Sequence, residues 1–336
     1  MKADDYLAAY GGKTVLVTGG AGAIGGNLCL ALARAGAALV LVLDDLSAAV
    51  PWNVPDLPNV KLVVGSVLDE EKLKQVFLAG PQLVFHLAAL FANQNSIDHP
   101  EQDLLVNGLG TLKVLQYCRL SGVQRLVYTS SGCSIYGSTS PLPLTEEFMS
   151  LHLSSPYQIT KMLGELYGNF FQQHYGLPVV KARLFNSYGP GEVPGQYRNV
   201  IPNFIYWALK GQTLPITGSG EETRDFTYVE DIVDGLLRAG ALAAAVGQEF
   251  NLAGGKETRI LDLARLINAR AGNGAGIRFT ERRRWDTKPR LWASVDKARA
   301  LLGHEPSTSL EEGLDRTFAW FRGHWPKIEA AARFGP

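Results

Sequence analysis

The stretch TVLVTGGAGAIG, residues 14–25, decides how this chain folds. Its first five residues are apolar or β-branched, as in a buried strand, and glycines crowd the turn that follows. Gly20, Gly22 and Gly25 fit the pattern GxGxxG, and Gly19, Gly22 and Gly25 fit GxxGxxG. Such a turn lets the backbone approach a pyrophosphate, and the helix behind it presents its positive N-terminus. The stretch therefore predicts a strand–turn–helix unit that binds a dinucleotide.

An acidic residue follows this unit at an informative distance. Asp44 stands nineteen residues after Gly25, at the end of the next apolar run. A carboxylate at that place can accept hydrogen bonds from an adenosine ribose. Because the same charge repels a ribose 2′-phosphate, the sequence favours NAD over NADP.

The order of elements in the first half of the chain indicates a parallel sheet. Apolar runs typical of buried strands occupy residues 14–18, 39–43, 61–64, 83–87, 126–129 and 179–184. Helical stretches alternate with them at residues 25–35, 70–79, 102–121 and 156–175. Strands that are apolar on both faces and alternate with helices form a parallel sheet covered on both sides. The predicted fold class is thus α/β, with a doubly wound parallel sheet.

The second half of the chain has a different pattern. After about residue 185 the alternation ends, glycine and proline become frequent, and helices return near residues 229–242, 259–271 and 309–321. We therefore predict a dinucleotide-binding domain over residues 1–184. A smaller, irregular α+β lobe is expected over residues 185–336, with some of its segments returning to the first domain.

Composition excludes several classes of function. The chain has 336 residues, of which 46% are hydrophobic, and its 32 basic and 32 acidic side chains give a formal net charge of zero. A protein that binds nucleic acid by neutralising phosphates would normally carry a basic surplus, so no nucleic-acid partner is expected. The longest uncharged apolar run is only about as long as a buried strand, so no membrane span is expected.

The cysteines and the first residues of the chain indicate the cellular compartment. Cys29, Cys118 and Cys133 are odd in number and far apart, so neither a disulfide framework nor a metal site is expected. The first residues lack the basic and then apolar pattern of a signal peptide. These features predict a cytoplasmic protein with reduced thiols.

A tyrosine and a lysine suggest acid–base chemistry. Tyr157 and Lys161 are four residues apart in an expected helix, so they share one helix face. A phenol, with a pKa near 10, is a poor base at neutral pH. A neighbouring ammonium and a positively charged nicotinamide would lower the pKa of Tyr157, and we expect such a lowering here.

These motifs, taken in order, resemble the extended short-chain dehydrogenase/reductases, in particular the nucleotide-sugar epimerase, dehydratase and decarboxylase group. The resemblance covers roughly residues 13–320 and implies a Rossmann-type fold with bound NAD. It rests on the glycine-rich turn, on Tyr157 and Lys161, and on five further stretches. These are DDLS (44–47), VFHLAA (84–89), VYTSS (127–131), RLFNSYGP (183–190) and TRDFTYV (223–229).

The resemblance implies a set of residues that bind the cofactor. The expected NAD-binding residues are Gly19, Gly22, Ala23, Ile24, Gly25, Asp44, Ser66, Val67, Leu87, Ala88, Ala89, Asn107, Tyr157 and Lys161. Lys161 would hold the nicotinamide ribose. The chain departs from the family at Ser66, because members often have an aspartate there that contacts adenine. A serine or the backbone of Val67 is expected to serve instead.

The resemblance also implies contacts with a nucleotide-diphosphate sugar. The expected substrate-binding residues are Asn186, Val200, Arg224, Arg283 and Asp286. An arginine matches this task because its planar fork binds phosphate in bidentate fashion. For Arg283, within the run RRR at residues 282–284, a solvated surface role is an equal alternative.

The catalytic serine or threonine of the family falls in an ambiguous stretch. Counting from the strand before it selects Ser131, whereas counting back from Tyr136 selects Gly132, because this loop is one residue longer than usual. We prefer Ser131, since the strand fixes direction better than the loop. Cys133 is a further candidate for the catalytic set, although a packed thiol is the simpler interpretation.

The resemblance implies transient oxidation of a sugar hydroxyl, most often at C4. Dehydratases and decarboxylases of the family usually carry a carboxylate just after the active serine or threonine, and residues 132–134 are Gly-Cys-Ser. The sequence therefore favours a 4-epimerase. The alternatives are a dehydratase, a decarboxylase and an NAD-binding sensor without activity.

The family also commonly forms homodimers through a four-helix bundle made by residues 102–121 and 156–175 of each copy. Both stretches carry apolar side chains, namely Leu105, Leu109, Leu112, Leu115, Met162, Leu166 and Phe170. We expect the same homodimer here. The alternative is that these side chains only face the sheet of their own chain.

Overall fold

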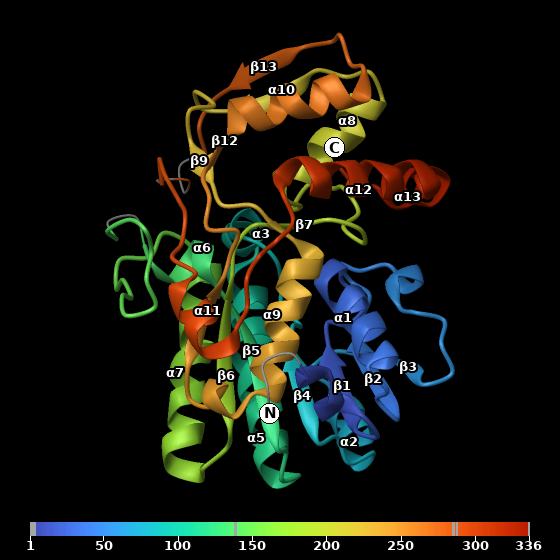
Figure 1. The fold of residues 1–336 in the computed structure, drawn as a ribbon, viewed down its shortest axis with the longest axis vertical. Helices are drawn as coiled ribbons and strands as arrows, with labels where there is room; N and C mark the ends of the chain where they lie inside the picture. Colours follow the sequence, from blue (N-terminus) through green and yellow to red (C-terminus); the bar gives the residue numbers. More distant parts are fainter. Residues whose placement is uncertain (1–4, 138–139, 284–285, 287, 335–336) are drawn as a thin grey trace.

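The structure is a computed structural model, and it describes residues 5–137, 140–283, 286 and 288–334. Seven parallel strands form its central sheet (Figure 1). In spatial order they are β11 (Glu249–Leu252), β6 (Val179–Leu184), β5 (Arg125–Ser131), β4 (Leu83–His86), β1 (Thr14–Thr18), β2 (Leu39–Asp44) and β3 (Val60–Val64). The predicted doubly wound α/β fold is confirmed.

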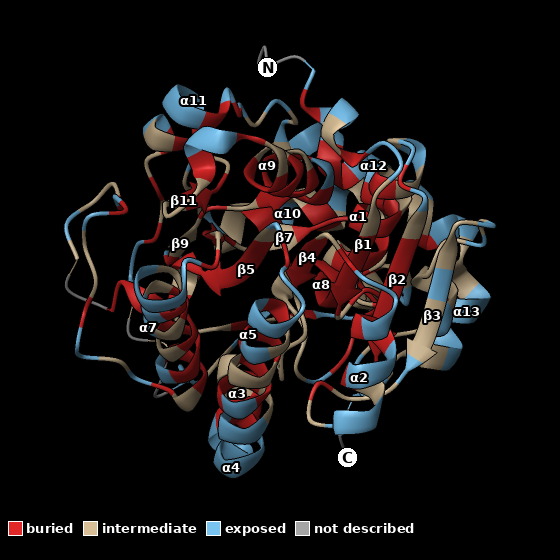
Figure 2. Cartoon of the chain, turned by 90° about the horizontal axis from the view of Figure 1, so that it is seen from below, coloured by how far each residue is buried: buried red, intermediate tan, exposed pale blue. Residues whose placement is uncertain are grey.

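Helices cover both faces of this sheet. On one face lie α1 (Ala23–Arg34) and α9 (Val229–Ala241), which pack against each other. The other face is covered by α2 (Glu70–Leu78), α5 (Gly110–Leu120) and α7 (Pro156–Tyr175). Figure 2 shows the buried strands between these layers, with only the edge strand β3 largely outside the core. The strands are apolar on both faces because each face meets a helix layer.

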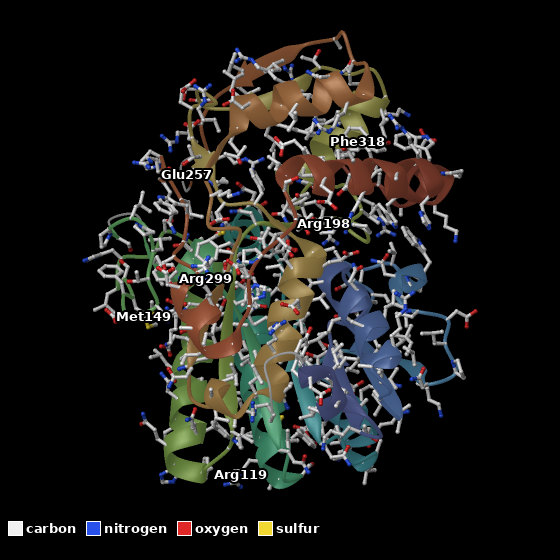
Figure 3. The ribbon with its side chains drawn as sticks, viewed as in Figure 1. Arg119, Met149, Arg198, Glu257, Arg299 and Phe318 are labelled. Carbon is white, nitrogen blue, oxygen red and sulfur yellow. The ribbon has the colours of Figure 1, made fainter. Side chains whose placement is uncertain are left out.

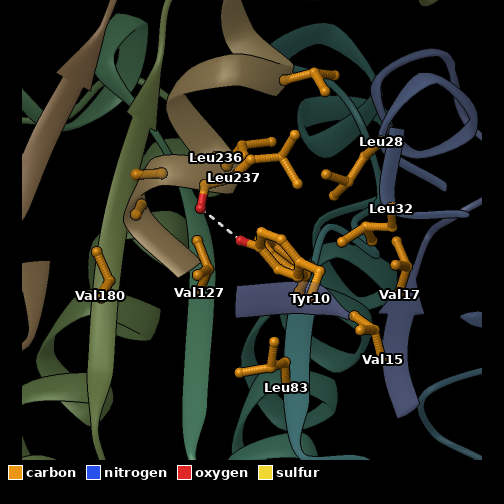
Figure 4. Close-up of a cluster of buried hydrophobic side chains, with 14 of the residues drawn as sticks. Tyr10, Val15, Val17, Leu28, Leu32, Leu83, Val127, Val180, Leu236 and Leu237 are labelled. Atoms are coloured by element: carbon orange, nitrogen blue, oxygen red, sulfur yellow. Dashed lines mark hydrogen bonds between the residues drawn. The ribbon is translucent and has the colours of Figure 1, made fainter. Parts of the chain in front are cut away.

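Part of the core comes from segments far apart in the sequence. Figure 4 shows side chains of β1, β4, β5 and β6 packed with those of α1 and α9 around Tyr10. The hydroxyl of Tyr10 donates a hydrogen bond to the carbonyl of Leu237. Residues beyond 184 therefore return to the first sheet, through α9, β11 and α11 (Asp296–Leu302). The domain boundary at residue 184 itself stays a prediction.

The predicted strands and helices of the first half are present, with two differences. The expected helix over residues 102–121 is divided into α4 (Pro100–Asp103), a π-helical turn labelled η3 (Leu104–Leu109) and α5. The seventh strand, β11, was not expected. Its four residues, EFNL, include a glutamate and an asparagine, so no apolar run marks it as a buried strand.

The rest of the chain forms a smaller α+β part around its own apolar cluster. Its helices are α8 (Val200–Leu209), α10 (Ile260–Ala271), α12 (Leu310–Gly323) and α13 (Trp325–Ala331). Its strand pairs are β8 (Leu214–Thr217) with β13 (Ile277–Thr280), and β9 (Thr223–Arg224) with β12 (Thr258–Arg259). The pair β7 (Ser187–Tyr188) and β10 (Thr227–Tyr228) leads into it from the sheet.

The remaining elements are short. They are η1 (Tyr6–Tyr10), η2 (Pro51–Asn53), α3 (Asn93–Asp98), α6 (Gly132–Ile135) and η4 (Ala243–Ala245). Within the described part of the chain, no helix combines the length and the apolar character that crossing a membrane requires.

Candidate active site

One large cavity lies where the carboxyl ends of the strands meet the smaller part of the chain. Its volume is about 1170 Å³, and segments of both parts line it. Ligands of open α/β sheets bind at this edge, because the strand order reverses there between β1 and β4. Of the predicted residues, the lining includes Gly19, Gly22, Ala23, Ile24, Gly25, Asp44, Ser66, Val67, Leu87, Ala88, Ala89, Ser131, Cys133, Tyr157, Lys161, Asn186, Val200, Arg224, Arg283 and Asp286.

The glycine-rich turn is shaped by close backbone contacts. Gly19 has a φ of 72°, and a Cβ atom on it would lie 2.6 Å from the amide nitrogen of Ala88. A Cβ atom on Gly25 would overlap the carbonyl oxygen of Gly19. Gly22 is the N-cap residue of α1 and lines the cavity. A Cβ atom on Gly20 would lie 2.7 Å from Cγ1 of Val42, so both glycine patterns fit the turn. The helix N-terminus at the cavity suits a pyrophosphate.

Asp44 ends β2 with its carboxylate fixed at the cavity. Its two oxygens accept hydrogen bonds from the amides of Ala21 (3.0 Å) and Leu46 (2.9 Å). Burial raises the pKa of Asp44, whereas these two amides and the charge of Arg198 lower it. Figure 3 shows Arg198 where the two parts of the chain meet, and it also lines the cavity. Sequence reasoning missed Arg198, because no motif surrounds it.

Replacing Asp44 with alanine tests the expected cofactor preference. The variant should bind NAD at least roughly tenfold more weakly, because hydrogen bonds to a charged group are lost. Its preference for NAD over NADP should also narrow. Calorimetric titration of both nucleotides, after removal of any that co-purifies, measures this. Tighter binding of NADP than of NAD by the wild-type protein would contradict the role given to Asp44.

Beyond β4, the position of Asn107 differs from the expectation that it binds the cofactor. Asn107 is buried and does not line the cavity. Its side chain accepts a hydrogen bond from the amide of Leu90 (2.7 Å) and donates one to Asp103 (2.7 Å). It therefore supports, from behind, the loop that carries Leu87, Ala88 and Ala89. Ser66 also has a local role, because its hydroxyl accepts a hydrogen bond from the amide of Leu68 (3.2 Å).

Tyr157, Lys161 and Ser131 meet at one wall of the cavity. Tyr157 lies in the first turn of α7, which begins at Pro156 behind the capping residue Ser155. Lys161 donates a hydrogen bond to the carbonyl of Thr129 (3.0 Å), and its ammonium is 5.7 Å from the ring centre of Tyr157. Ser131, at the end of β5, also lines the cavity, and its hydroxyl is near enough to Tyr157 to lower the pKa of that phenol.

The electrostatics of this wall differ from the expectation. Burial raises the pKa of Tyr157 well above its usual value, and the nearby hydroxyl of Ser131 only partly offsets this. Burial lowers the pKa of Lys161 to about 8, against the opposing charge of Asp103. The protein's own groups therefore raise the pKa of Tyr157, and the expected lowering, which also needs the charge of a bound nicotinamide, stays a prediction.

The geometry distinguishes the two candidates for the catalytic serine position. A Cβ atom on Gly132 would overlap the buried ring of Phe185, so no side chain fits there. Ser131, in contrast, lines the cavity beside Tyr157 and accepts a hydrogen bond from Ser134 (2.8 Å). Cys133 also lines the cavity, but burial raises the pKa of its thiol. These observations favour Ser131 as the partner of Tyr157.

The smaller part supplies cations on the opposite side. Arg224 forms an ion pair with Asp286 (2.6 Å), and both line the cavity, as does Arg283. Asn186 donates a hydrogen bond to the carbonyl of Asp225 (3.0 Å) and so joins β6 to this region. Sequence reasoning missed Lys288, which lines the cavity two residues after Asp286.

Comparison with known proteins places this geometry in a family. Residues 15–253 match the family described as "NAD dependent epimerase/dehydratase family". The chain belongs to this family. The match spans the sheet, the glycine-rich turn and the Tyr157–Lys161 pair, and the predicted membership and NAD dependence are confirmed.

Individual members of the epimerase/dehydratase family are similar over nearly the whole chain. A UDP-glucose 4-epimerase of Mycolicibacterium smegmatis is 35% identical, over 91% of this chain and 98% of that protein. The epimerase Mth375 of Methanothermobacter thermautotrophicus is 55% identical, with a TM-score of 0.97 over 99% and 98% of the two chains. A UDP-glucose 4-epimerase of Thermotoga maritima, solved with UDP-glucose, is 34% identical, with a TM-score of 0.88 over 93% and 99%. The prediction of an NAD-dependent nucleotide-sugar epimerase is confirmed, and a UDP-glucuronic acid decarboxylase of Xenopus tropicalis is also similar, with 32% identity over 94% of this chain.

Proposed function

We propose that this chain is a UDP-sugar 4-epimerase and that Tyr157, Ser131 and Lys161 carry the reaction. The observation that supports this most is the meeting of these three side chains at one wall of a cavity shared by both parts of the chain. The glycine-rich turn and Asp44 occupy the NAD side of that cavity, and Arg224 with Asp286 occupies the other. The UDP specificity is proposed from the names of the relatives described above.

Each side chain has a distinct part in the proposed reaction. Tyr157 takes the proton from the C4 hydroxyl of the sugar, and Ser131 shares the hydrogen bond to that oxygen. Lys161, whose ammonium donates a hydrogen bond to the carbonyl of Thr129, would hold the nicotinamide ribose and keeps a positive charge beside the phenol. When bound, NAD supplies an acceptor for the hydride of C4. The hydride then returns to the other face of the sugar ring, so the net redox change of the reaction is zero.

The environment of the catalytic wall disfavours dehydration and decarboxylation. Residues 132–134 offer no carboxylate, and the thiol of Cys133 is neutral because burial raises its pKa. Glu146, the next acidic residue in the chain, accepts a hydrogen bond from the amide of Asn251 (2.8 Å) instead of facing the cavity. A reaction that needs only Tyr157, Ser131 and NAD therefore fits best.

The spectrum of the bound cofactor tests this proposal against a sensor without activity. A UDP-sugar that is oxidised at C4 should produce transient near-ultraviolet absorbance of enzyme-bound NADH. The Tyr157→Phe variant should show much less of this signal at the same NAD occupancy. If no UDP-sugar produces bound NADH and no epimer accumulates, the proposed function is wrong.

We also propose a homodimer through η3, α5 and α7, as the resemblance implied. Leu105 (47% exposed), Leu109 (41%), Leu166 (52%) and Phe170 (47%) present apolar side chains to solvent along these helices. Leu115 and Met162, which were expected in the same interface, are instead buried within the chain. Contiguous exposed apolar side chains mark an interaction surface, and a two-fold dimer is the commonest assembly.

Light scattering on a size-exclusion column measures this assembly. The protein at micromolar concentration should have twice the chain mass of 36.5 kDa. Leu166→Glu should shift the particle to the single-chain mass, because a charge would be buried at the interface. A wild-type particle of 36.5 kDa would count against the dimer.

The cytoplasmic location stays a prediction that rests on the cysteines and the N-terminal residues. Fractionation of cells that express the intact protein would test the location directly.

A further inference from the structure

A cation inside the cavity is not explained by the contacts described so far. Lys288 lines the cavity, and its ammonium donates a hydrogen bond to the carbonyl of Cys133 (2.6 Å). An ammonium has three donors, and a peptide carbonyl satisfies only one of them without balancing the charge. Within the described ranges, no carboxylate lies at ion-pair distance from it, and the nearby Asp286 is already paired with Arg224 (2.6 Å).

Lys288 lies between the diphosphate side and the catalytic wall. Its carbonyl accepts a hydrogen bond from Arg224 (3.2 Å), so its backbone is next to the cation that we assign to the diphosphate. Its ammonium reaches the carbonyl of Cys133, two residues after Ser131, and Ser131 lines the same cavity as Tyr157. A sugar nucleotide that extends from Arg224 to Tyr157 must therefore place its sugar ring beside Lys288.

The charge of Lys288 persists in this setting. Burial lowers the pKa of Lys288 to about 8, and the charge of Arg224 acts in the same direction, whereas Cys133 and Asp286 act in the opposite one. The side chain is thus mostly protonated at neutral pH, although it has lost much of its hydration. A cation in this state gains most from an anionic partner, because the surrounding dielectric is low.

The substituents beside the reacting carbon identify the partner. C4 faces Tyr157 in the proposed reaction, and its two ring neighbours are C3, which carries a neutral hydroxyl in a simple hexose, and C5, which carries C6. Of these two positions, C6 is the one that becomes an anion, as the carboxylate of a hexuronate. We propose that Lys288 binds a carboxylate at C6 of the sugar, so that the preferred substrate is a UDP-hexuronate and not a neutral UDP-hexose. This inference rests on the proposed 4-epimerase function and makes its substrate class specific.

Steady-state kinetics with three UDP-sugars test the inference. The substrates are UDP-glucuronate, UDP-glucose and UDP-N-acetylmuramate, whose carboxylate is on a C3 ether. The wild-type kcat/KM should be roughly 10–100-fold higher for UDP-glucuronate than for UDP-glucose, as expected for a hydrogen-bonded charge pair. Lys288→Met should remove most of this preference, because it should lower kcat/KM for UDP-glucuronate, mainly through KM, at least roughly tenfold more than it lowers the value for UDP-glucose.

Two control variants separate recognition from folding. Lys288→Arg keeps the charge and should retain part of the preference. Lys210→Met removes a surface lysine that pairs with Glu329, outside the cavity, and should change neither substrate's kinetics. Lys288→Met and the wild-type protein should have nearly the same melting temperature, although their kinetics differ.

The outcomes that overturn the inference differ from those that overturn the proposed function. An equal loss for UDP-glucuronate and UDP-glucose in Lys288→Met would assign Lys288 to the diphosphate or to structure. A wild-type preference for UDP-glucose, or a Lys288-dependent preference for UDP-N-acetylmuramate alone, would also overturn the C6 assignment. Absence of an epimer from every UDP-sugar would instead overturn the 4-epimerase function itself.

Discussion

Tyr157→Phe should lower kcat by at least roughly 10²–10⁴-fold, the range attributed to one positioned acid–base group. The variant loses the hydroxyl that takes the C4 proton but keeps the ring. That ring packs edge-on against Phe91, with centroids 6.1 Å apart, and lines the cavity. Binding of NAD and of UDP-sugar should therefore change little. Single-turnover kinetics and calorimetry on the same preparation separate these two effects.

A second tyrosine provides the matched control. Tyr10 is fully buried, donates a hydrogen bond to the carbonyl of Leu237, and is remote from the cavity lining. Tyr10→Phe should reduce stability by about 1 kcal/mol and leave kcat unchanged. If Tyr157→Phe kept wild-type turnover, proton transfer would have to be assigned to another group, and the proposed role of Tyr157 would fail.

Glu165→Gln should destabilise the protein by roughly 3–5 kcal/mol, because it leaves Arg183 buried without its anion. Glu165 on α7 and Arg183 on β6 form a two-armed ion pair at 3.0 and 2.8 Å, with both side chains 1% exposed. Nη1 of Arg183 donates two further hydrogen bonds, to the hydroxyl of Tyr136 (3.0 Å) and to the carbonyl of Glu146 (2.8 Å). This pair joins the helix that carries Tyr157 to the sheet.

Thermal and denaturant unfolding measure this loss. The double variant Glu165→Leu with Arg183→Met is the control, since apolar side chains of similar volume can replace a buried pair at little cost. It should be more stable than Glu165→Gln. A melting temperature of Glu165→Gln equal to that of wild type would show that the pair does not stabilise the attachment of α7.

The parts of the site that could be predicted are those fixed by short-range physics. The turn at Gly19–Gly25 follows from strand, glycine and helix order, and the spacing of Tyr157 and Lys161 follows from one helical turn. Asp44 follows from the end of the second strand. Each of these depends only on neighbouring residues, so the sequence pattern contains the necessary information.

Other features depend on contacts between distant segments. Lys288 reaches Cys133 across 155 residues, and no local pattern predicts such a contact. Strand β11 joins the sheet because β6 offers it a free edge, although its own residues form no apolar run. Asn107 was expected near the cofactor, and the hydrogen bond with Leu90 turns its side chain behind the loop instead.

The choice between Ser131 and Gly132 also depends on a contact between distant segments. Counting along the chain selects either residue, depending on the anchor used. The ring of Phe185, more than fifty residues later, excludes any side chain at Gly132. Packing from a distant strand end therefore decides a question that spacing leaves open.

The central claim is that the chain inverts C4 of a UDP-sugar by removing and returning the same hydride. The most direct measurement uses UDP-glucuronate and UDP-glucose labelled with deuterium at C4, with the products identified by mass spectrometry and NMR. The account predicts a product of equal mass that has inverted configuration at C4 and retains the deuterium there. A product lighter by water or carbon dioxide, or loss of the deuterium to solvent, would contradict it.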